Sequence, residues 1–247
     1  VGLSNDDLFD VYGAITRSLD ASLARLRLDH VDIFQLHNTL GRTDFRGTLT
    51  IDQIMDAVVP AFDKLRDSGK VRFLGFTAKG EADDVHKLVS CGVFHSAQVF
   101  YNLLVPSAGE PIATTYPSDD YKLLLETAKD HGVGAIGVRV LAGGALSGSV
   151  VRHPLGMRDV TPIGSETDYA TDVKRGLAFM PLVEAGHAGS LIELAIRYVI
   201  SNPALPTTEI GIATLDELQQ ATAAVNKGPL STHALAAIKR VQARFVI

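Results

Sequence analysis

The chain has 247 residues, of which 46% are hydrophobic, so its composition excludes a largely disordered protein and provides for a substantial core. Its formal net charge is -5 and its basic residues are scattered, which argues against a nucleic-acid-binding protein. The single cysteine, Cys91, excludes an internal disulfide, and no apolar run reaches the roughly 18 residues that a membrane-spanning helix needs. Because no signal-peptide pattern opens the chain, a cytoplasmic protein without a membrane partner is expected.

The first predicted element is an amphipathic helix from about Asp6 to Arg27, with Ser4 as its N-cap. Apolar residues recur in it at intervals of three and four, which is typical of a helix that packs one face on a sheet: Leu8, Val11, Ile15, Leu19, Leu23 and Leu26. The apolar run 31–36 then predicts a buried strand. This strand ends at His37 and Asn38.

The same order of elements repeats along the rest of the chain. A polar loop over 38–50 leads to a helix over 51–67 and a strand over 71–76, with Gly69 between them as the expected helix terminator. Further strands are predicted over 93–101, 134–141 and 208–213. Further helices are predicted over 81–90, 119–131, 215–225 and 231–244, with one or two more between residues 168 and 200.

Alternating helices and apolar strands predict an α/β fold in which helices cover parallel strands. Two architectures fit, a doubly wound sheet and a (β/α)8 barrel. No glycine motif has the spacing of a dinucleotide-binding doubly wound fold, and Gly143 and Gly144 predict a loop that approaches a ligand closely. The long connections 105–118 and 147–167 are typical of binding loops or lids. We expect one domain over 1–247.

Polar residues follow the predicted strands at their carboxyl ends: His37, Asn38, Thr77, Gln98, Asn102, Arg139 and Thr214. A single histidine at a strand end is more often a structural residue than a catalytic one. The loops that follow parallel strands converge on one edge, however, and ligands bind there. Because polar residues follow several strands at this same edge, the sequence favours a binding site there.

Several stretches, in order, resemble motifs of the aldo-keto reductase superfamily: RSLDASLARL at 17–26, LDHVDIFQLH at 28–37, SGKVRFLGF at 68–76, QVFYNL at 98–103 and LAGG at 141–144. The resemblance covers nearly the whole chain. It implies a (β/α)8 TIM barrel that binds NADPH or NADH. It also implies hydride transfer between this cofactor and a small aldehyde, ketone or sugar-like substrate.

The resemblance also implies roles for single residues. His37 matches the catalytic histidine that orients the carbonyl. The residues that match cofactor-binding positions are Thr77, Gln98, Arg139, Leu141, Gly143, Gly144, Thr214, Glu217 and Gln220. Thr77 and Gln98 would hold the nicotinamide amide, 141–144 would line the path of the pyrophosphate, and Gln220 would contact the adenine.

Some positions depart from the family pattern. Ala78 stands where an asparagine is usual, Val138 where an aromatic ring is common and Arg139 where a serine is common. Glu217 replaces a basic residue that binds the 2′-phosphate of NADP, which favours NAD or an unusual mode of NADP binding. The family's tyrosine, lysine and aspartate of the catalytic set would lie ahead of Val1, so three N-terminal βα units are expected to be absent.

Three interpretations therefore stand beside one another. The chain is the C-terminal two-thirds of an active reductase, or it is a non-catalytic nicotinamide-binding regulatory subunit, or it is a barrel fragment completed by another polypeptide or by self-association as a homo-oligomer. A metal-dependent hydrolase is disfavoured because the histidines lack the spacing of metal ligands, and no metal is predicted. Substrate selection is assigned to the loops around 42–45 and 116–120.

Overall fold

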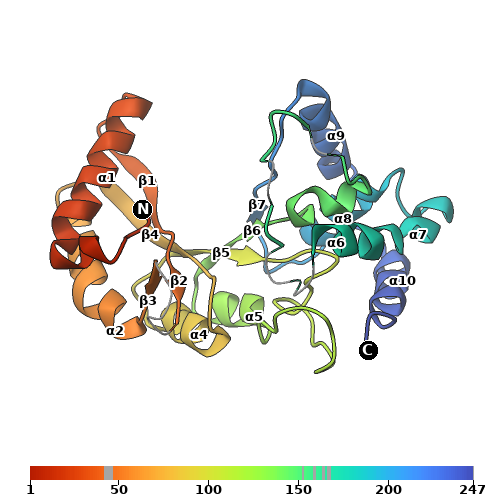
Figure 1. Ribbon diagram of the computed structural model, residues 1–247, viewed down its shortest axis with the longest axis horizontal. Helices are drawn as coiled ribbons and strands as arrows, with labels where there is room; N and C mark the ends of the chain where they lie inside the picture. Colours follow the sequence, from red (N-terminus) through yellow and green to blue (C-terminus); the bar gives the residue numbers. More distant parts are fainter. Residues whose placement is uncertain (42–46, 152, 158–159, 163–164, 166–167, 247) are drawn as a thin grey trace. The chain divides into compact units, whose positions relative to one another are not determined.

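The computed structural model describes residues 1–246 except 42–46, 152, 158–159, 163–164 and 166–167. Contacts between residues group the chain into two compact units, and Figure 1 labels the elements of both. The first unit comprises 1–99 with 127–135, and the second comprises 100–126 with 136–247. The single domain expected over 1–247 stays a prediction, and the loop 42–45 that was assigned to substrate selection lies outside the described residues.

The predicted first helix is interrupted at Asp10. A short turn of 3-10 helix, Asp6–Phe9, comes before the helix α1, Val11–Leu26. Asp10 has φ of -147°, and its side chain accepts a hydrogen bond of 2.9 Å from the Gly13 N–H, so it is the N-cap of α1. The prediction that the helix begins at Asp6 with Ser4 as its cap was therefore wrong.

Three parallel strands form the centre of the first unit: β1 (Val31–Leu36), β4 (Val71–Thr77) and β5 (Ser96–Phe100). The apolar runs predicted all three strands, and the structure confirms them. Two further strands, β2 (Thr39–Leu40) and β3 (Thr48–Leu49), pair in parallel within the predicted polar loop. The sequence did not reveal them because two residues are too few to show alternation.

The helices of the first unit are α1, α2 (Ile51–Gln53), α3 (Val59–Asp67) and α4 (Ala82–Ser90). The predicted helix 51–67 contains a π-helical turn, Ile54–Val58, directly ahead of Pro60. Proline has no N–H to donate inside a helix, and such a position commonly disturbs the α-helical hydrogen bonds. Phe62 of α3 is fully buried, and its ring lies 5.4 Å from that of Phe34 on β1.

In the second unit, β6 (Gly134–Val138) pairs in parallel with β7 (Thr207–Thr208). The predicted strand over 134–141 is shorter than expected because Arg139 has a positive φ of 58°, which ends the extended conformation. The last predicted strand, 208–213, is reduced to the two residues of β7. The 3-10 segment η3 (Ala142–Ser147) follows the end of β6.

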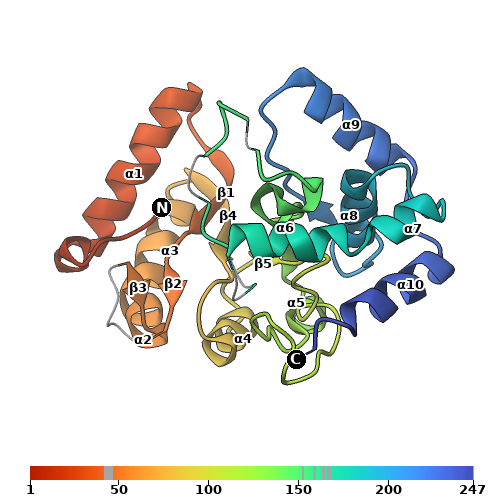
Figure 2. The same cartoon turned by 45° about the vertical axis from the view of Figure 1, so that its right-hand side comes forward.

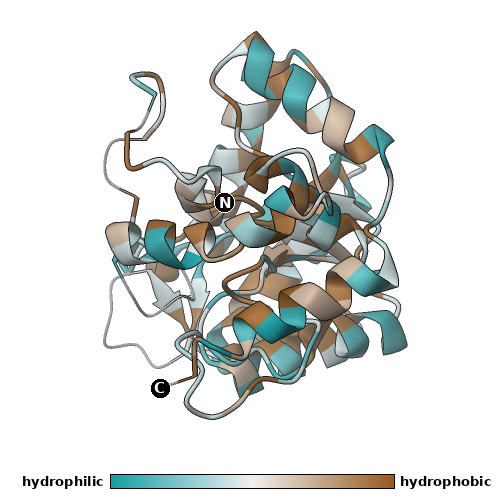
Figure 3. Ribbon diagram, turned by 90° about the vertical axis from the view of Figure 1, so that its right-hand side faces the viewer, coloured by the Kyte–Doolittle hydropathy of each residue, from teal (hydrophilic) through white to brown (hydrophobic). Residues whose placement is uncertain are grey.

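The second unit contains five helices over 169–242, of which α8 packs against β7. They are α6 (Tyr169–Leu177), α7 (Met180–Glu184), α8 (Leu191–Ile200), α9 (Leu215–Asn226) and α10 (Thr232–Gln242). Three helices rather than one or two thus lie between residues 168 and 200, since Gly186, with φ of 80°, ends α7. Figure 2 shows α8 beside α9, and Figure 3 shows hydrophobic and hydrophilic residues adjoining along the helices, as expected for amphipathic helices.

The helix α5 (Leu124–Asp130) begins later than the predicted residue 119. The Ser107 hydroxyl donates to the Asp119 carbonyl at 2.6 Å and accepts from the Tyr121 N–H at 3.0 Å, which holds this stretch in a non-helical turn. Lys122 and Leu123 both have positive φ and complete the turn. Within the part of the chain that the structure describes, no helix is long and apolar enough to cross a membrane.

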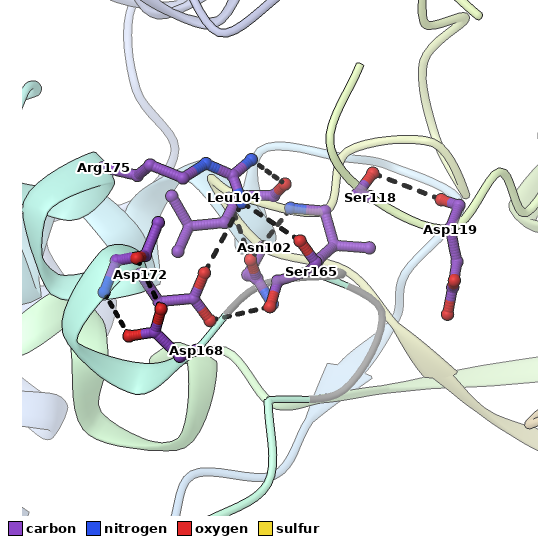
Figure 4. A network of polar contacts seen from close by, with 10 residues as sticks. Asn102, Leu104, Ser118, Asp119, Ser165, Asp168, Asp172 and Arg175 are labelled. Carbon is purple, nitrogen blue, oxygen red and sulfur yellow. Dashed lines mark hydrogen bonds and ion pairs between the residues drawn. The ribbon is translucent and has the colours of Figure 1, made fainter. Parts of the chain in front are cut away.

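A buried arginine joins distant segments of the second unit. Arg175 on α6 is 8% exposed, and its guanidinium donates to the carbonyl oxygens of Leu104 at 3.2 Å and Ser165 at 3.4 Å. The Asp172 carboxylate, 1% exposed, lies 3.5 Å from the guanidinium and accepts a 2.8 Å bond from the Ser165 hydroxyl (Figure 4). The guanidinium also faces the ring of Phe245, 5.0 Å away. Arg175, Asp172 and Ser165 thus form a buried polar cluster.

A second buried charge, Glu193 on α8, accepts hydrogen bonds from Lys227 at 2.7 Å and from Arg197 at 2.9 Å. Burial alone would raise the pKa of the Glu193 carboxyl, but the bonds from Lys227 and Arg197 outweigh it and hold this pKa below its usual value. The charged carboxylate therefore stabilises the fold at neutral pH.

The contribution of the Glu193 carboxylate should be visible in the pH dependence of the free energy of unfolding. Because the folded-state pKa lies below the unfolded value, the stabilisation is complete above the unfolded pKa and is lost as pH falls through the folded-state pKa. We expect Glu193→Gln to lower the free energy of unfolding at pH 7 and to flatten its fall on acidification, measured by urea unfolding. Glu184→Gln, at an exposed carboxylate, is the control, and equal pH profiles of the two variants would contradict the assignment.

Candidate functional site

The strand ends of the first unit bring together three of the residues singled out in the sequence. Leu36 pairs with Phe76, and Thr77 pairs with Gln98, so His37, Thr77 and Gln98 lie at the same level of adjacent parallel strands. The His37 Nδ1 lies 2.7 Å from the Thr77 Oγ1, and the Thr77 hydroxyl donates to the Gln98 Oε1 at 2.7 Å. Thr77 is buried, whereas His37 is exposed. We call these three residues the strand-end triad.

One layer beneath the triad, on the same face of the strands, Gln35 pairs with Gly75 and Gly75 pairs with Ser96. A Cβ atom at Gly75 would lie 2.4 Å from the Ser96 Oγ and 2.9 Å from the Gln35 Cγ. The Ser96 hydroxyl is buried without a hydrogen-bond partner among the described residues. The glycine is thus needed for space, because it lets two side chains approach beneath the triad.

Gly75→Ala should therefore destabilise the chain by about 1–3 kcal/mol, the usual cost of overpacking a filled interior. Urea unfolding followed by circular dichroism would measure it. Gly211→Ala is the control, since a Cβ at Gly211 meets nothing within 4 Å. A loss at Gly75 no larger than that at Gly211 would contradict the steric argument.

Asn38 is adjacent to His37, but its side chain hydrogen-bonds backbone groups. Its side-chain amide donates to the carbonyl oxygens of Leu3 at 2.8 Å and Gly47 at 3.0 Å, and its Oδ1 accepts from the Leu3 N–H at 2.9 Å. Asn38 is 3% exposed. These contacts use both amide protons, so the Asn38 side chain fixes the loop after β1.

The second unit contains a cavity of about 540 Å³. Six residues predicted to bind a cofactor line it: Arg139, Leu141, Gly143, Gly144, Glu217 and Gln220. Further parts of its wall come from His153, Leu155, Met157 and Val160 and from the segment 209–213. Residue patterns did not single out these wall residues, although the length of the loop 147–167 was a signal that it has a binding role.

The start of η3, which follows β6, has a backbone that favours close approach. Gly143 and Gly144 have φ of 67° and 106°, in the region that favours glycine, and a Cβ at Gly143 would lie 2.5 Å from the Val160 side chain. The Asn102 amide donates to the Arg139 carbonyl at 2.9 Å, which fixes the turn at the end of β6. At Gly143 and Gly144 the cavity wall therefore consists of main-chain atoms, and the Asn102 hydrogen bond fixes the turn ahead of them.

Side chains of α9 and of its N-cap residue cap the N–H groups at the start of the helix. The Thr214 hydroxyl accepts from the Glu217 N–H at 3.2 Å, and the Glu217 carboxylate accepts from the N–H groups of Ala213 and Thr214, which forms a capping box. Thr214 thus acts as the N-cap of α9. The Glu217 carboxylate places a negative charge at the cavity wall and occupies amides that would otherwise attract an anion.

Buried tyrosines of the second unit are unsuited to proton donation. Burial raises the pKa of Tyr101 and the pKa of Tyr116 to about 12. Burial also raises the pKa of Tyr121. A phenol with so high a pKa is a poor acid near neutral pH, so these side chains support the core. Among the described residues, no group of three histidine, cysteine or acidic side chains could hold a metal ion.

A sequence model of the aldo/keto reductase family matches residues 11–243 of the chain. The chain belongs to the aldo/keto reductase family. Among curated relatives of this aldo/keto reductase chain, L-galactose dehydrogenase from Arabidopsis thaliana is 28% identical over 217 residues. The uncharacterized oxidoreductase YrpG from Bacillus subtilis is 27% identical over 219 residues. The alignments cover 86% and 85% of this chain, which spans 58% of the length of each relative.

Solved structures similar to the aldo/keto reductase chain share its fold. The holo form of aldo-keto reductase AKR11C1 from Bacillus halodurans is 21% identical with a TM-score of 0.64, over 93% of this chain and 67% of its own. Glycerol dehydrogenase AKR11B4 from Gluconobacter oxydans is 19% identical with a TM-score of 0.65, over 95% of this chain and 65% of its own. The predicted fold class, an α/β fold of the aldo-keto reductase barrel type, is confirmed.

Proposed function

We propose that this chain forms part of an NAD(P)H-dependent oxidoreductase that interconverts a small aldehyde, ketone or sugar-like carbonyl compound and the corresponding alcohol. The observation that carries the proposal is the strand-end triad, in which His37, Thr77 and Gln98 form one hydrogen-bonded chain at the carboxyl ends of parallel strands. Ligands bind at this edge in α/β folds. Membership of the aldo/keto reductase family supports the redox chemistry.

Each residue has a proposed task. The exposed His37 hydrogen-bonds the reacting oxygen of the substrate, and Thr77 and Gln98 hold the carboxamide of the nicotinamide. The backbone around Gly143 and Gly144 accommodates the pyrophosphate, for which its positive φ angles and lack of side chains are suited. The cofactor supplies or accepts the hydride when bound.

Direct measurement tests this function. The purified chain is titrated with NADH and NADPH, and binding is followed by the fluorescence of the reduced nicotinamide. Turnover is then followed by its absorbance with aldehydes, ketones and aldoses. Saturable cofactor binding with turnover of at least one carbonyl class is expected, and failure to bind either cofactor would overturn the proposal.

A second function, nicotinamide binding without catalysis, is favoured by two observations. Tyr101 and Tyr116 have pKa values raised to about 12 by burial, so neither supplies a proton, and the buried Ala78 offers no amide beside Thr77. Saturable cofactor binding with no turnover of any carbonyl tested would identify this regulatory function.

The carboxylate of Glu217 favours NADH over NADPH in this proposal, because it repels a 2′-phosphate and can accept a hydrogen bond from a ribose hydroxyl. We expect Glu217→Gln to improve the affinity for NADPH relative to NADH roughly tenfold, or about 1.4 kcal/mol. Glutamine retains the capping box, so the helix is preserved. Parallel fluorescence titrations with both cofactors measure the ratio.

Asp216→Asn provides the matched control for charge. Asp216 is exposed on the same turn of α9 and bonds Gln220, but it does not line the cavity. An equal change in the NADPH to NADH ratio for the Asp216 and Glu217 variants would show that net charge, and not the position of Glu217, determines the preference.

A further inference from the structure

Asn102 is a buried residue to which the proposed function gives no role. The sequence places it among the polar residues near strand ends, two residues after the end of β5 at Phe100. Asn102 is 1% exposed, and the described wall of the cavity does not include it. Any effect of this side chain on a ligand must therefore pass through the residues that it hydrogen-bonds.

The hydrogen bonds of Asn102 orient its side-chain amide. The Oδ1 accepts from the N–H groups of Leu104 at 2.9 Å and Val105 at 3.1 Å. The Nδ2 donates to the Arg139 carbonyl at 2.9 Å. Turning the amide over would place an NH2 group against two N–H donors and an oxygen against a carbonyl, so the observed orientation is the one that satisfies all three contacts.

Two helices hold the loop that carries Asn102. The Leu103 carbonyl accepts from the Gln242 side chain of α10 at 3.0 Å, and the Leu104 carbonyl accepts from the Arg175 guanidinium of α6 at 3.2 Å. Both donors are buried, so water has little access to compete for these bonds. The packing of the second unit therefore sets the position of Asn102.

Asn102 hydrogen-bonds a turn with an unfavourable backbone. Arg139 has φ of 58°, a left-handed conformation that costs free energy for a residue other than glycine. Its carbonyl also accepts from the Ala142 N–H at 2.8 Å, which closes the turn directly ahead of Gly143 and Gly144. The bonds from Asn102 and Ala142 use both lone pairs of this carbonyl and offset the cost of the turn.

We propose that Asn102 is a positioning residue for the diphosphate group of the cofactor. By holding the Arg139 carbonyl, Asn102 keeps the left-handed turn in place, and the turn sets the main-chain atoms of 141–144 in the cavity wall. A glycine-rich main chain lets a diphosphate approach closely. The inference rests on the proposed function for the identity of the ligand, which Asn102 affects only through Arg139.

Two variants remove the hydrogen bond from Asn102 to Arg139. Asn102→Asp keeps an oxygen for the two backbone N–H groups of its own loop, and its second oxygen cannot donate while the carboxylate is ionised. Asn102→Ala removes the bond without adding a charge, which keeps the test open if the first variant fails to fold. Asn202→Asp is the matched control, because it makes the same change at a half-buried residue of the same unit whose Oδ1 accepts from the Ala204 N–H.

Hydrogen exchange of the ligand-free full chain, followed by NMR, tests the first step. The Ala142 N–H bonds the Arg139 carbonyl, so loss of the Asn102 bond should let this amide exchange roughly tenfold faster. The Glu209 N–H, which bonds the Gly137 carbonyl at 2.8 Å ahead of the turn, is the internal reference and should keep its rate. An Ala142 amide that exchanges at the wild-type rate in both Asn102 variants would overturn the inference.

Calorimetric titration of the full chain with ADP-ribose tests the second step. ADP-ribose carries the diphosphate without the nicotinamide, so its affinity is independent of the task proposed for Thr77 and Gln98. We expect both Asn102 variants to bind it roughly tenfold more weakly than the wild type, and Asn202→Asp to bind it as the wild type does. Wild-type affinity in the Asn102 variants would overturn this inference alone. A wild-type chain that binds neither ADP-ribose nor NADH nor NADPH would overturn the proposed function and, with it, the ligand assigned here.

Discussion

Replacing Asp172 by alanine is expected to lower the free energy of unfolding by about 3–5 kcal/mol, the usual cost of leaving a buried charge without its partner. Arg175 is 8% exposed and cannot regain water without moving α6. The substitution also removes the acceptor of the Ser165 hydroxyl, which bonds Asp172 at 2.8 Å. The measurement is urea unfolding at pH 7.

Asp168→Ala is the matched control for Asp172→Ala. Asp168 lies one turn earlier, is exposed and caps α6 through the Thr171 N–H, so its loss should cost clearly less. The double variant Asp172→Leu with Arg175→Met should recover much of the stability, since apolar residues of similar size often replace a buried ion pair at little cost. Equal losses in the two single variants would refute the assigned importance of burial.

Replacing Phe62 by alanine is expected to have an effect of similar size, about 3–5 kcal/mol, because it creates a cavity in the core of the first unit. Phe62 is fully buried, and its ring lies 5.4 Å from that of Phe34 on β1. α3 also packs against both α1 and β4, so the cavity would be enclosed by several elements. Thermal and urea unfolding would both measure the loss.

Two comparisons test the role of packing at Phe62. Phe62→Leu retains most of the volume and should cost less than about 1.5 kcal/mol. Phe9→Ala should have almost no effect, because Phe9 is 93% exposed. A Phe62→Ala variant as stable as Phe9→Ala would contradict the structure of this core.

Strong periodic patterns in the sequence predicted the main strands and helices correctly. The apolar runs at 31–36 and 71–76 specified β1 and β4, since such runs are typical of parallel strands, although Ile33 and Phe73 are exposed. The break of α1 at Asp10 and the late start of α5 were missed. Both depend on a side chain that bonds a backbone group. Asp10 bonds Gly13 within the same turn, and Ser107 bonds Asp119 and Tyr121 from a distant loop. Such bonds compete with the helix without altering its apolar pattern.

The candidate site was predictable in part because the strands that carry it were predicted. Parallel strands deliver their last residues to one level, so the positions of His37, Thr77 and Gln98 along the sequence implied that they would meet. The direction of their hydrogen bonds required atomic positions. The cavity wall at Leu155 and Met157 was not predicted because a long irregular loop has no periodicity that would tell its inner residues from its outer ones.

The Glu217 carboxylate caps α9 and also places a negative charge at the cavity wall. A substitution that changes the charge can therefore remove the cap. Exchanging Glu217 for arginine would offer a phosphate a cation, yet it would also release the N–H groups of Ala213 and Thr214 and weaken the first turn of the helix. A redesign of cofactor choice at this position therefore trades affinity against helix stability. Glutamine is the side chain that changes the charge and retains the cap, and a design that needs arginine should first strengthen α9 elsewhere.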